Sequence, residues 1–360
     1  MNSDALYLFF SYLLGMGPIT FDKMLCHYGS LEKAYDAPIS EMRSAVGPVL
    51  AGKWSALRET LDPQAELHRL NDQGIVVLTR IHPKFPQSLL HIPDPPLCLY
   101  VKGNLDYYDF EKDLFVAVVG TRKPTSYGQQ LTGKFSRELS QSGCVIVSGM
   151  AMGIDAIAHM SALDGGGKTV AFLGCGVNIV YPQINAMLYD RILKENGLII
   201  SEFPPDMTVQ KGLFISRNRL ISGLSRGVLV IEGLHGSGSL ITARCALEQG
   251  KEVFAPPAPI TSLQSQAPNL LLKEGAKLVT DVQDILEEFG QRVSIPLKDV
   301  DLTDAEMELL AYLKEESLGS DDLSRSMKKP VSEILSILSS LELQEIVVKS
   351  EERGIYEIKI

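Results

Sequence analysis

Residues 114–290 alternate short apolar segments with helix-length segments, and this regularity limits the possible folds more than any other feature of the chain. Short segments that are apolar throughout are typical of strands buried on both faces of a parallel sheet. Intervening segments such as residues 127–142 and 154–163 are expected to be helices that cover those faces. The short basic segment with Arg217, Arg219 and Arg226 is expected to lead directly into the strand at 227–231. The predicted strands are residues 114–119, 144–148, 169–173, 198–201, 227–231 and 252–255.

Small or polar residues follow these strands at residues 120–125, 148–153, 174–176, 201–202 and 232–239. Ligands of parallel sheets bind at the carboxyl ends of the strands, where such turns converge on one crevice. The last turn precedes an Ala/Leu-rich helix at residues 240–249. Unpaired N–H groups at the positive end of a helix dipole favour an anion, most often phosphate. Taken alone, the turn is explained equally well as a simple chain reversal, and the nearby arginines favour the anion site.

Size and composition indicate a globular protein of two or three domains, with 360 residues and 45% hydrophobic content. The net charge of −10 means that a polyanion would have to meet a local basic groove. The five cysteines are spaced singly, which predicts buried thiols in a reducing compartment, with no disulfide frame and no metal site. The apolar N-terminus has no basic lead, so we expect a core helix, no membrane contact and a cytoplasmic protein.

Two smaller modules flank the α/β region, which we place at residues 64–290. This region begins with a proline-braced connector and an edge strand at 97–101, before the alternating segments. Residues 1–63 are expected to be helical, with a Gly-Met-Gly-Pro turn at 15–18. This turn resembles the hairpin of helix-hairpin-helix modules, whose N–H groups can hold a DNA phosphate; a tight turn in a packing domain is the alternative. Residues 291–301 are a predicted linker. Residues 302–360 follow a winged-helix pattern. The expected recognition helix carries Glu333 and Glu342 and no arginine, which favours protein contact over base reading.

Several ordered motifs resemble the DNA-processing protein A family, also called DprA or Smf. They are HIPDPPLCLYVKGNL, SGMAMGIDAIAHMSAL, GCGVNIVYP, SEFP, FISRNRLISGLSRGVLVIEG, GSGSLITARCALEQGKEVFA and LLKEGA. The resemblance implies a Rossmann-like core that binds single-stranded DNA, forms a homodimer and helps load the RecA recombinase during natural transformation. It also implies a non-enzymatic activity, and we expect no cofactor. The sequence departs from the family pattern at Met152, where an arginine is usual, and at Ala258 and Ala267.

The cations and small residues of the turns are the predicted contacts to DNA phosphates. A guanidinium can hold a phosphate through two hydrogen bonds, and the small residues supply amides and hydroxyls. The predicted contacts are Gly120, Thr121, Arg122, Lys123, Arg217, Asn218, Arg219, Gly236, Ser237, Gly238, Ser239 and Thr242. Further candidates are Lys211, Arg244, and Phe214 and Tyr181 as surfaces on which unpaired bases could stack.

Other interpretations of the same residues stay open. Arg217 and Arg219 could instead pair with Glu202 or Glu232. Asp155 and His159 could be a ligand or acid/base pair, or a hydrogen-bonded pair that fixes the preceding loop. An enzyme resembling nucleotide phosphoribohydrolases is an alternative function, although apolar Leu240 and Ile241 occupy the place of its expected carboxylate. A sensor for a nucleotide-derived ligand is a third possibility.

Overall fold

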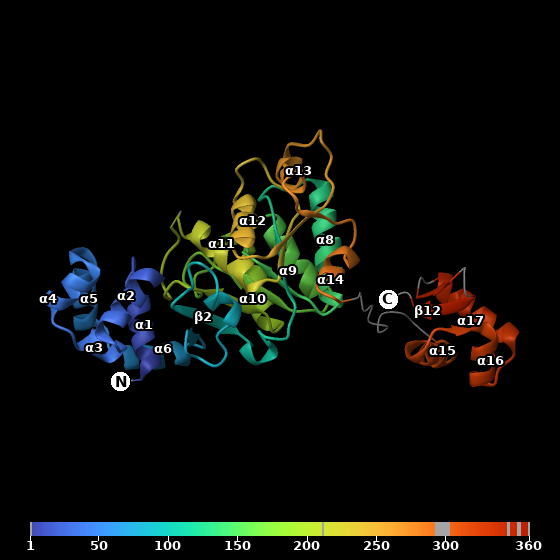
Figure 1. Cartoon of the computed structure of the whole chain (residues 1–360), viewed down its shortest axis with the longest axis horizontal. Coiled ribbons are helices and arrows are strands. Elements are labelled where there is room, and N and C mark those ends of the chain that lie inside the picture. The colour runs from blue at the N-terminus through green and yellow to red at the C-terminus, as the bar shows by residue number, and fades with distance from the viewer. Residues whose placement is uncertain (1, 211, 292–302, 344–345, 351–353, 359–360) are drawn as a thin grey trace. The chain divides into compact units, whose positions relative to one another are not determined.

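The computed structural model describes residues 2–210, 212–291, 303–343, 346–350 and 354–358. The chain divides into two compact units, Met1–Gln291 and Arg292–Ile360. The first unit contains a large sheet with its helices, and the second contains a small sheet with helices of its own (Figure 1).

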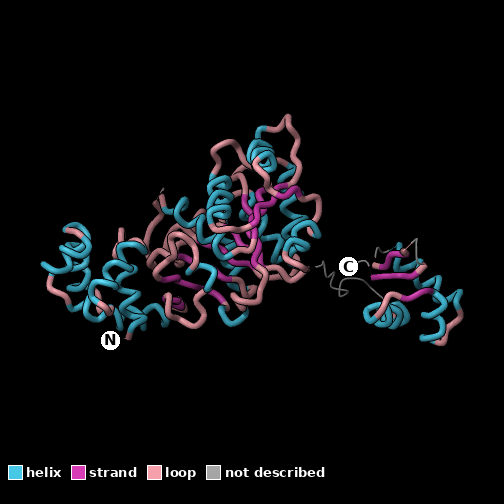
Figure 2. The backbone as a smooth tube through the Cα atoms, viewed as in Figure 1, coloured by secondary structure: helices cyan, strands magenta, loops and turns pink. Residues whose placement is uncertain are grey.

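The first unit is built on a nine-stranded sheet of order β1-β2-β6-β5-β4-β3-β7-β8-β9. All neighbouring strands from β6 to β9 in this order are parallel, whereas β2 pairs antiparallel with both β1 and β6. The strands, magenta in Figure 2, are β1 (Val76–Thr79), β2 (Cys98–Gly103), β3 (Phe115–Val119), β4 (Val145–Ser148), β5 (Thr169–Phe172), β6 (Leu198–Ser201), β7 (Gly227–Val230), β8 (Glu252–Ala255) and β9 (Lys277–Leu278).

Helices cover both faces of this sheet, as the continuous apolar strands predicted. Successive residues of β5 and β6 belong to different cores: Ala171 and Ile199 pack with α9 (Ile154–Asp164) and α10 (Ala186–Lys194). Val170 and Ile200 pack in the core that contains α11 (Leu213–Leu224), α12 (Gly238–Glu248) and α13 (Gln266–Lys273). A further helix, α8 (Ser126–Gln141), packs on α9. The predicted α/β class is therefore confirmed.

The chain order reverses between the central neighbours β3 and β7. From β3 the chain winds through β4 and β5 to β6, and from β7 it winds in the other direction through β8 to β9. The loops after β3 and β7 consequently lead to helices on opposite faces and leave a crevice between them. The strand order thus places the turns at residues 120–125 and 232–239 beside each other.

The N-terminal helices pack against one face and edge of the same unit. They are α1 (Ser3–Ser11), α2 (Pro18–Tyr28), α3 (Leu31–Asp36), α4 (Ile39–Val46), α5 (Pro48–Thr60) and α6 (Pro63–Asp72). Phe9, Trp54 and Tyr100 belong to one continuous core, and the hydroxyls of Ser11 and Tyr100 lie 2.6 Å apart. Short helices α7 (Gln87–Leu90) and α14 (Gln283–Glu288) and the 3-10 turns η1 (Leu105–Tyr107), η2 (Gln183–Asn185) and η3 (Leu263–Ser265) complete the unit.

The second unit has helices α15 (Asp304–Glu315), α16 (Ser320–Met327) and α17 (Val331–Leu343) and an antiparallel sheet of order β10-β12-β11. Its strands are β10 (Leu318–Gly319), β11 (Val347–Lys349) and β12 (Ile355–Ile358). Thr303 and Glu306 form the capping box that starts α15. Apart from Gln291, the predicted linker at 291–301 lies outside the described residues.

The main difference from the predicted elements is helix α11, because residues 213–224 were expected to be a basic segment that leads into a strand. Arg217, Leu220, Ile221 and Leu224 share one buried helical face with spacings of three, four and seven residues. The amphipathic pattern is hard to recognise in the sequence because Arg217 lies within this apolar stripe and Ser222 and Gly223 are also buried. Helix α6 and the two-residue strands β9 and β10 were also missed. Among the described helices, none is long and apolar enough to cross a membrane.

Candidate anion-binding crevice

The predicted turns gather around one crevice at the reversal point of the sheet. Its cavity has a volume of about 360 Å³. Most of the predicted phosphate contacts line it: Gly120, Thr121, Arg122, Arg217, Asn218, Gly236, Ser237, Gly238, Ser239 and Thr242. Residues that come from β3, α11 and the start of α12 therefore share one cavity.

The N-terminus of α12 forms one wall of the crevice. The N–H groups of Gly238 and Ser239 lie in the first helical turn, where no preceding residue of the helix can accept from them. The Ser237 and Ser239 hydroxyls bond to each other at 2.7 Å, and the Thr242 hydroxyl donates to the Gly238 carbonyl at 3.4 Å. Ser239 and Thr242 are buried, so the backbone amides and Ser237 form the open part of this wall. Amides and a dipole at this position favour an anion.

A buried carboxylate, Glu232, joins the two walls. Its backbone carbonyl accepts from the Thr121 amide at 2.8 Å. Its side chain accepts from the amide and hydroxyl of Thr125 at 2.9 and 2.5 Å. Glu232 therefore holds the loop after β3 against the loop after β7 and fixes the width of the crevice. From the sequence, Glu232 was expected only as a possible partner for an arginine, and this role was not predicted.

Arg217 lies beneath the crevice as a buried cation. Only 4% of the residue is exposed, its Nη1 donates to the Gly149 carbonyl at 2.7 Å and to the Phe172 carbonyl, and its Nε is buried without a partner. Burial lowers the pKa of Arg217 to about 10, a change that the charge of Asp155 opposes. A buried cation with mostly carbonyl partners is costly, and an anion above it would lower that cost.

Asp155 fixes the loop before α9, as one of the two interpretations predicted. Its Oδ2 accepts from the amides of Gly149 and Ala151 at 3.1 and 3.4 Å. Burial raises the pKa of Asp155, and the nearby Arg217 charge opposes the rise. Gly149 has no room for a side chain, because an added Cβ would overlap the Arg217 guanidinium. Arg217, Gly149 and Asp155 thus form one interlocked floor.

His159 does not share this role with Asp155. Its Nδ1 lies 2.6 Å from the Thr169 hydroxyl, and its Nε2 is buried without a partner. Burial lowers the pKa of His159 to about 3, with a smaller contribution from the Arg217 charge, so the ring is neutral at physiological pH. The expected pair is therefore two separate contacts. No cluster of three or more metal-ligating side chains occurs within the described residues.

Arg122 is the exposed cation at the mouth of the crevice. Its guanidinium lies 5.9 Å from the centre of the Phe214 ring and makes no ion pair with any described residue. The ring centres of Phe214 and Tyr181 lie 5.4 Å apart, and both rings line a small side cavity with Arg122. The neighbouring Lys123 is exposed but lies outside the residues that line the crevice. The aromatic candidates are therefore next to the predicted phosphate contacts.

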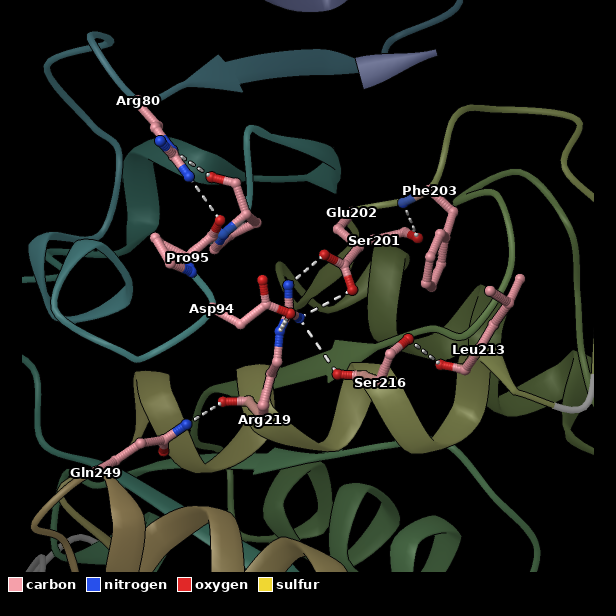
Figure 3. Close-up of polar contacts among 11 residues, drawn as sticks. Arg80, Asp94, Pro95, Ser201, Glu202, Phe203, Leu213, Ser216, Arg219 and Gln249 are labelled. Carbon is pink, nitrogen blue, oxygen red and sulfur yellow. Dashed lines mark hydrogen bonds and ion pairs between the residues drawn. The ribbon is translucent and has the colours of Figure 1, made fainter. Parts of the chain in front are cut away.

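Arg219 faces a different cavity from Arg217, on the other side of α11. Its guanidinium makes two hydrogen bonds to Glu202, at 2.9 and 2.6 Å, and its Nε lies 3.0 Å from Asp94 (Figure 3). Only 13% of its side chain is exposed. The pairing with Glu202 that the sequence left open is therefore present, and Arg219 does not line the crevice.

The predicted hairpin turn lines the same second cavity as Arg219. Residues 15–18 lie there beside Asp94 and Glu202. Two carboxylates and one cation leave this cavity with a negative balance, which disfavours a phosphate. The packing role of the Gly-Met-Gly-Pro turn is the better supported of its two interpretations.

The remaining candidates lie at the borders of the site or outside the description. Lys211 lies outside the described residues. Arg244 is exposed on α12 and does not line the crevice. Met152 lines the side cavity with Tyr181. Ala267 is buried, and its amide donates to the Gly233 carbonyl at 2.8 Å. Ala258 accepts a hydrogen bond from the Asn269 side chain at 3.2 Å.

The fold and crevice define a Rossmann-like α/β protein with a candidate anion site at the point where the strand order reverses. Residues 76–290 match the family model described as DNA recombination-mediator protein A, and the chain belongs to this family. It is 37% identical over 301 residues to protein Smf of Synechocystis, an alignment that covers 83% of this chain and 75% of that protein.

Solved structures agree with this assignment. The crystal structure of DNA processing protein A from Streptococcus pneumoniae matches with a TM-score of 0.68 and 35% identity, over 80% of this chain and 98% of that chain. The DNA processing protein A from Helicobacter pylori, whose structure is described in terms of its single-stranded DNA binding mode, matches with a TM-score of 0.53 and 34% identity. That match covers 60% of this chain and 95% of that chain.

Proposed function

We propose that this protein is a recombination mediator that binds single-stranded DNA, protects it and helps to load RecA onto it during natural transformation. The observation that carries the proposal is the meeting of the α12 amides, the loop after β3 and Arg122 in one crevice. The family description and the single-stranded DNA binding mode named for the Helicobacter pylori relative support the choice of ligand.

Binding would be electrostatic and would not depend on base sequence. Phosphates would occupy the N-terminus of α12 and the loop at Gly120 and Thr121, with Arg122 as a bidentate clamp. Arg217 would contribute its charge from below, because its Nη1 is held by the backbone carbonyls of Gly149 and Phe172. Such contacts grip the sugar-phosphate chain and leave the bases unread.

Unpaired bases would stack at the mouth of the crevice. Phe214 and Tyr181 line the side cavity beside Arg122, and a base inserted there would meet one cation and two rings. Stacking contributes roughly 1–3 kcal/mol per base and tolerates any base, because every base has an aromatic face. A duplex hides those faces, so this contact favours single strands.

The partners proposed for this activity are RecA and a second copy of the chain, in the cytoplasm. The C-terminal unit, which we propose to be a winged-helix module, is better suited to protein contact than to DNA. Its helix α17 contains no lysine or arginine, and Glu333 on it pairs with Lys329 at 3.2 Å. A DNA-reading helix needs cations for the phosphates that flank the groove.

A salt titration of oligonucleotide binding tests the proposal. Fluorescence anisotropy with a single-stranded and a duplex oligonucleotide should show tighter binding of the single strand. The logarithm of its affinity should fall with the logarithm of salt concentration at a slope of about −3 if roughly four phosphates are neutralised. Equal affinity for the duplex, or no dependence on salt, would refute it. Release of free base from nucleoside monophosphates would instead favour the phosphoribohydrolase alternative.

A further inference from the structure

Exposed apolar side chains follow the side cavity of the crevice along the chain. We call this set the apolar ledge, and it consists of Met152, Tyr181, Ile184 and Met187. Met152 and Tyr181 line the side cavity and are 42% and 39% exposed. Ile184 and Met187 follow Tyr181 by three and six residues and are 77% and 87% exposed. Apolar side chains exposed beside a binding cavity are common in surfaces that contact a ligand.

The ledge is firmly attached to the crevice. The side-chain amide of Asn185, which lies between Ile184 and Met187, donates to the Met150 and Ala151 carbonyls at 2.9 and 3.3 Å. Met150 and Ala151 directly precede Met152. One turn beyond Met187, Arg191 pairs with Asp164 of α9 at 2.8 Å. The start of α10 is thus fixed on both sides, and a ligand leaving the crevice at Met152 would meet a surface that is already formed.

Charge and shape identify what this surface can hold. The ledge itself carries no charged side chain, so it offers nothing to a phosphate. Methionine is flexible, and its sulfur makes favourable contacts with aromatic rings of roughly 0.3–1.5 kcal/mol. Nucleobases are flat aromatic rings, and a single strand that enters the crevice by its phosphates projects them to one side. A surface of flexible thioethers would accept any base.

From this we infer that the apolar ledge binds the bases of the strand that emerges from the crevice beside Met152. The inference rests on the proposed function, because the phosphates must first be held in the crevice. It extends the binding site by the length of η2 and the start of α10, and it assigns base contact to residues outside the predicted phosphate set. The strand is gripped by charge in the crevice and by its bases on the ledge.

The test compares base removal in the DNA with side-chain replacement in the protein. The full chain and the double variant Ile184→Asn/Met187→Gln are titrated with an oligothymidylate and with the same oligonucleotide carrying abasic spacers. Val49→Asn serves as the control, because Val49 is 75% exposed on α5. Wild type and Val49→Asn should bind the base-bearing strand about five-fold or more tightly than the abasic strand.

In the double variant, a measurable part of this difference should disappear while the salt slope stays unchanged, and the remainder is expected from Phe214 and Tyr181, which still line the side cavity. The inference is overturned if the double variant discriminates as well as wild type does, or if wild type binds both strands equally. A double variant that keeps its discrimination but loses self-association in sedimentation would assign the ledge to a second copy of the chain. If wild type shows no salt-dependent binding to either strand, the proposed function itself fails, which is a distinct result.

Discussion

Replacing Arg219 tests whether this cation stabilises the fold or contacts DNA. The Arg219→Met variant removes a guanidinium that makes two hydrogen bonds to Glu202. The side chains of Arg219 and Glu202 are only 13% and 14% exposed. Breaking a buried pair from one side costs about 3–5 kcal/mol, because the remaining charge is left without compensation. Asp94 is 52% exposed and contributes less than about 1 kcal/mol. The pair lines an open cavity that water can enter, so we expect a loss near 3 kcal/mol.

The assay is urea unfolding followed by the fluorescence of Trp54, the single tryptophan, which is fully buried in the first unit. The double variant Arg219→Met/Glu202→Met removes both charges and should recover about 2 kcal/mol of the loss, since apolar replacement of a buried pair is often nearly neutral. An Arg219→Met variant within 1 kcal/mol of wild type would refute this reasoning. So would a double variant less stable than the single one.

Three further predictions concern Arg122 at the mouth of the crevice and two buried residues, His159 and Gly149. Arg122→Gln should reduce the magnitude of the salt slope of single-strand binding by about 0.7, whereas Arg219→Met and the exposed control Lys194→Gln should leave it unchanged, as anisotropy would show. The pKa of His159 is about 3 in the folded state and 6.5 in the unfolded chain, so the stability that neutral His159 contributes is fully present only above pH 6.5. Between pH 7 and pH 5 the unfolded chain takes up a proton at this residue and the folded chain does not, so the free energy of unfolding should fall by about 2 kcal/mol. Urea unfolding of His159→Asn should lack this loss. Gly149→Ala places a Cβ against the Arg217 guanidinium and should destabilise the protein by about 1–3 kcal/mol in the same unfolding assay, with unchanged stability contradicting the tight floor.

The sequence predicted the parallel sheet well because its central strands are apolar on both faces. The strands that begin near Phe115, Val145 and Gly227 lie within one residue of their predicted positions. The order of the strands cannot be predicted from the local sequence pattern, because it depends on contacts between distant segments. The reversal between β3 and β7 therefore appeared only in the structure. That reversal is what brings the two predicted turns together.

The arginines show where local reasoning about the site stops. Arg217 and Arg219 are two residues apart, and the sequence treated them as equivalent cations. On a helix, residues two apart point in directions about 200° apart. Arg217 therefore enters the floor of the crevice, and Arg219 enters the second cavity to pair with Glu202. Recognising helix α11 from its buried stripe would have separated their roles.

Glu232 was missed for a related reason. It follows a buried strand in a Gly-rich turn, where a carboxylate is ordinarily read as a ligand or as an arginine partner. Its true partners are the amide and hydroxyl of Thr125, which is 107 positions away in sequence. Only the pairing of β3 with β7 brings these residues together.

The most direct test of the central claim is the dependence of affinity on strand length. Anisotropy competition at one salt concentration would compare thymidine monophosphate with oligothymidylates of increasing length. A crevice that grips several phosphates of one strand predicts affinity that rises with length until the site is filled, and weaker binding of a duplex of the same length. A mononucleotide that binds as tightly as the longest strand would contradict it and would indicate a sensor for a small nucleotide ligand.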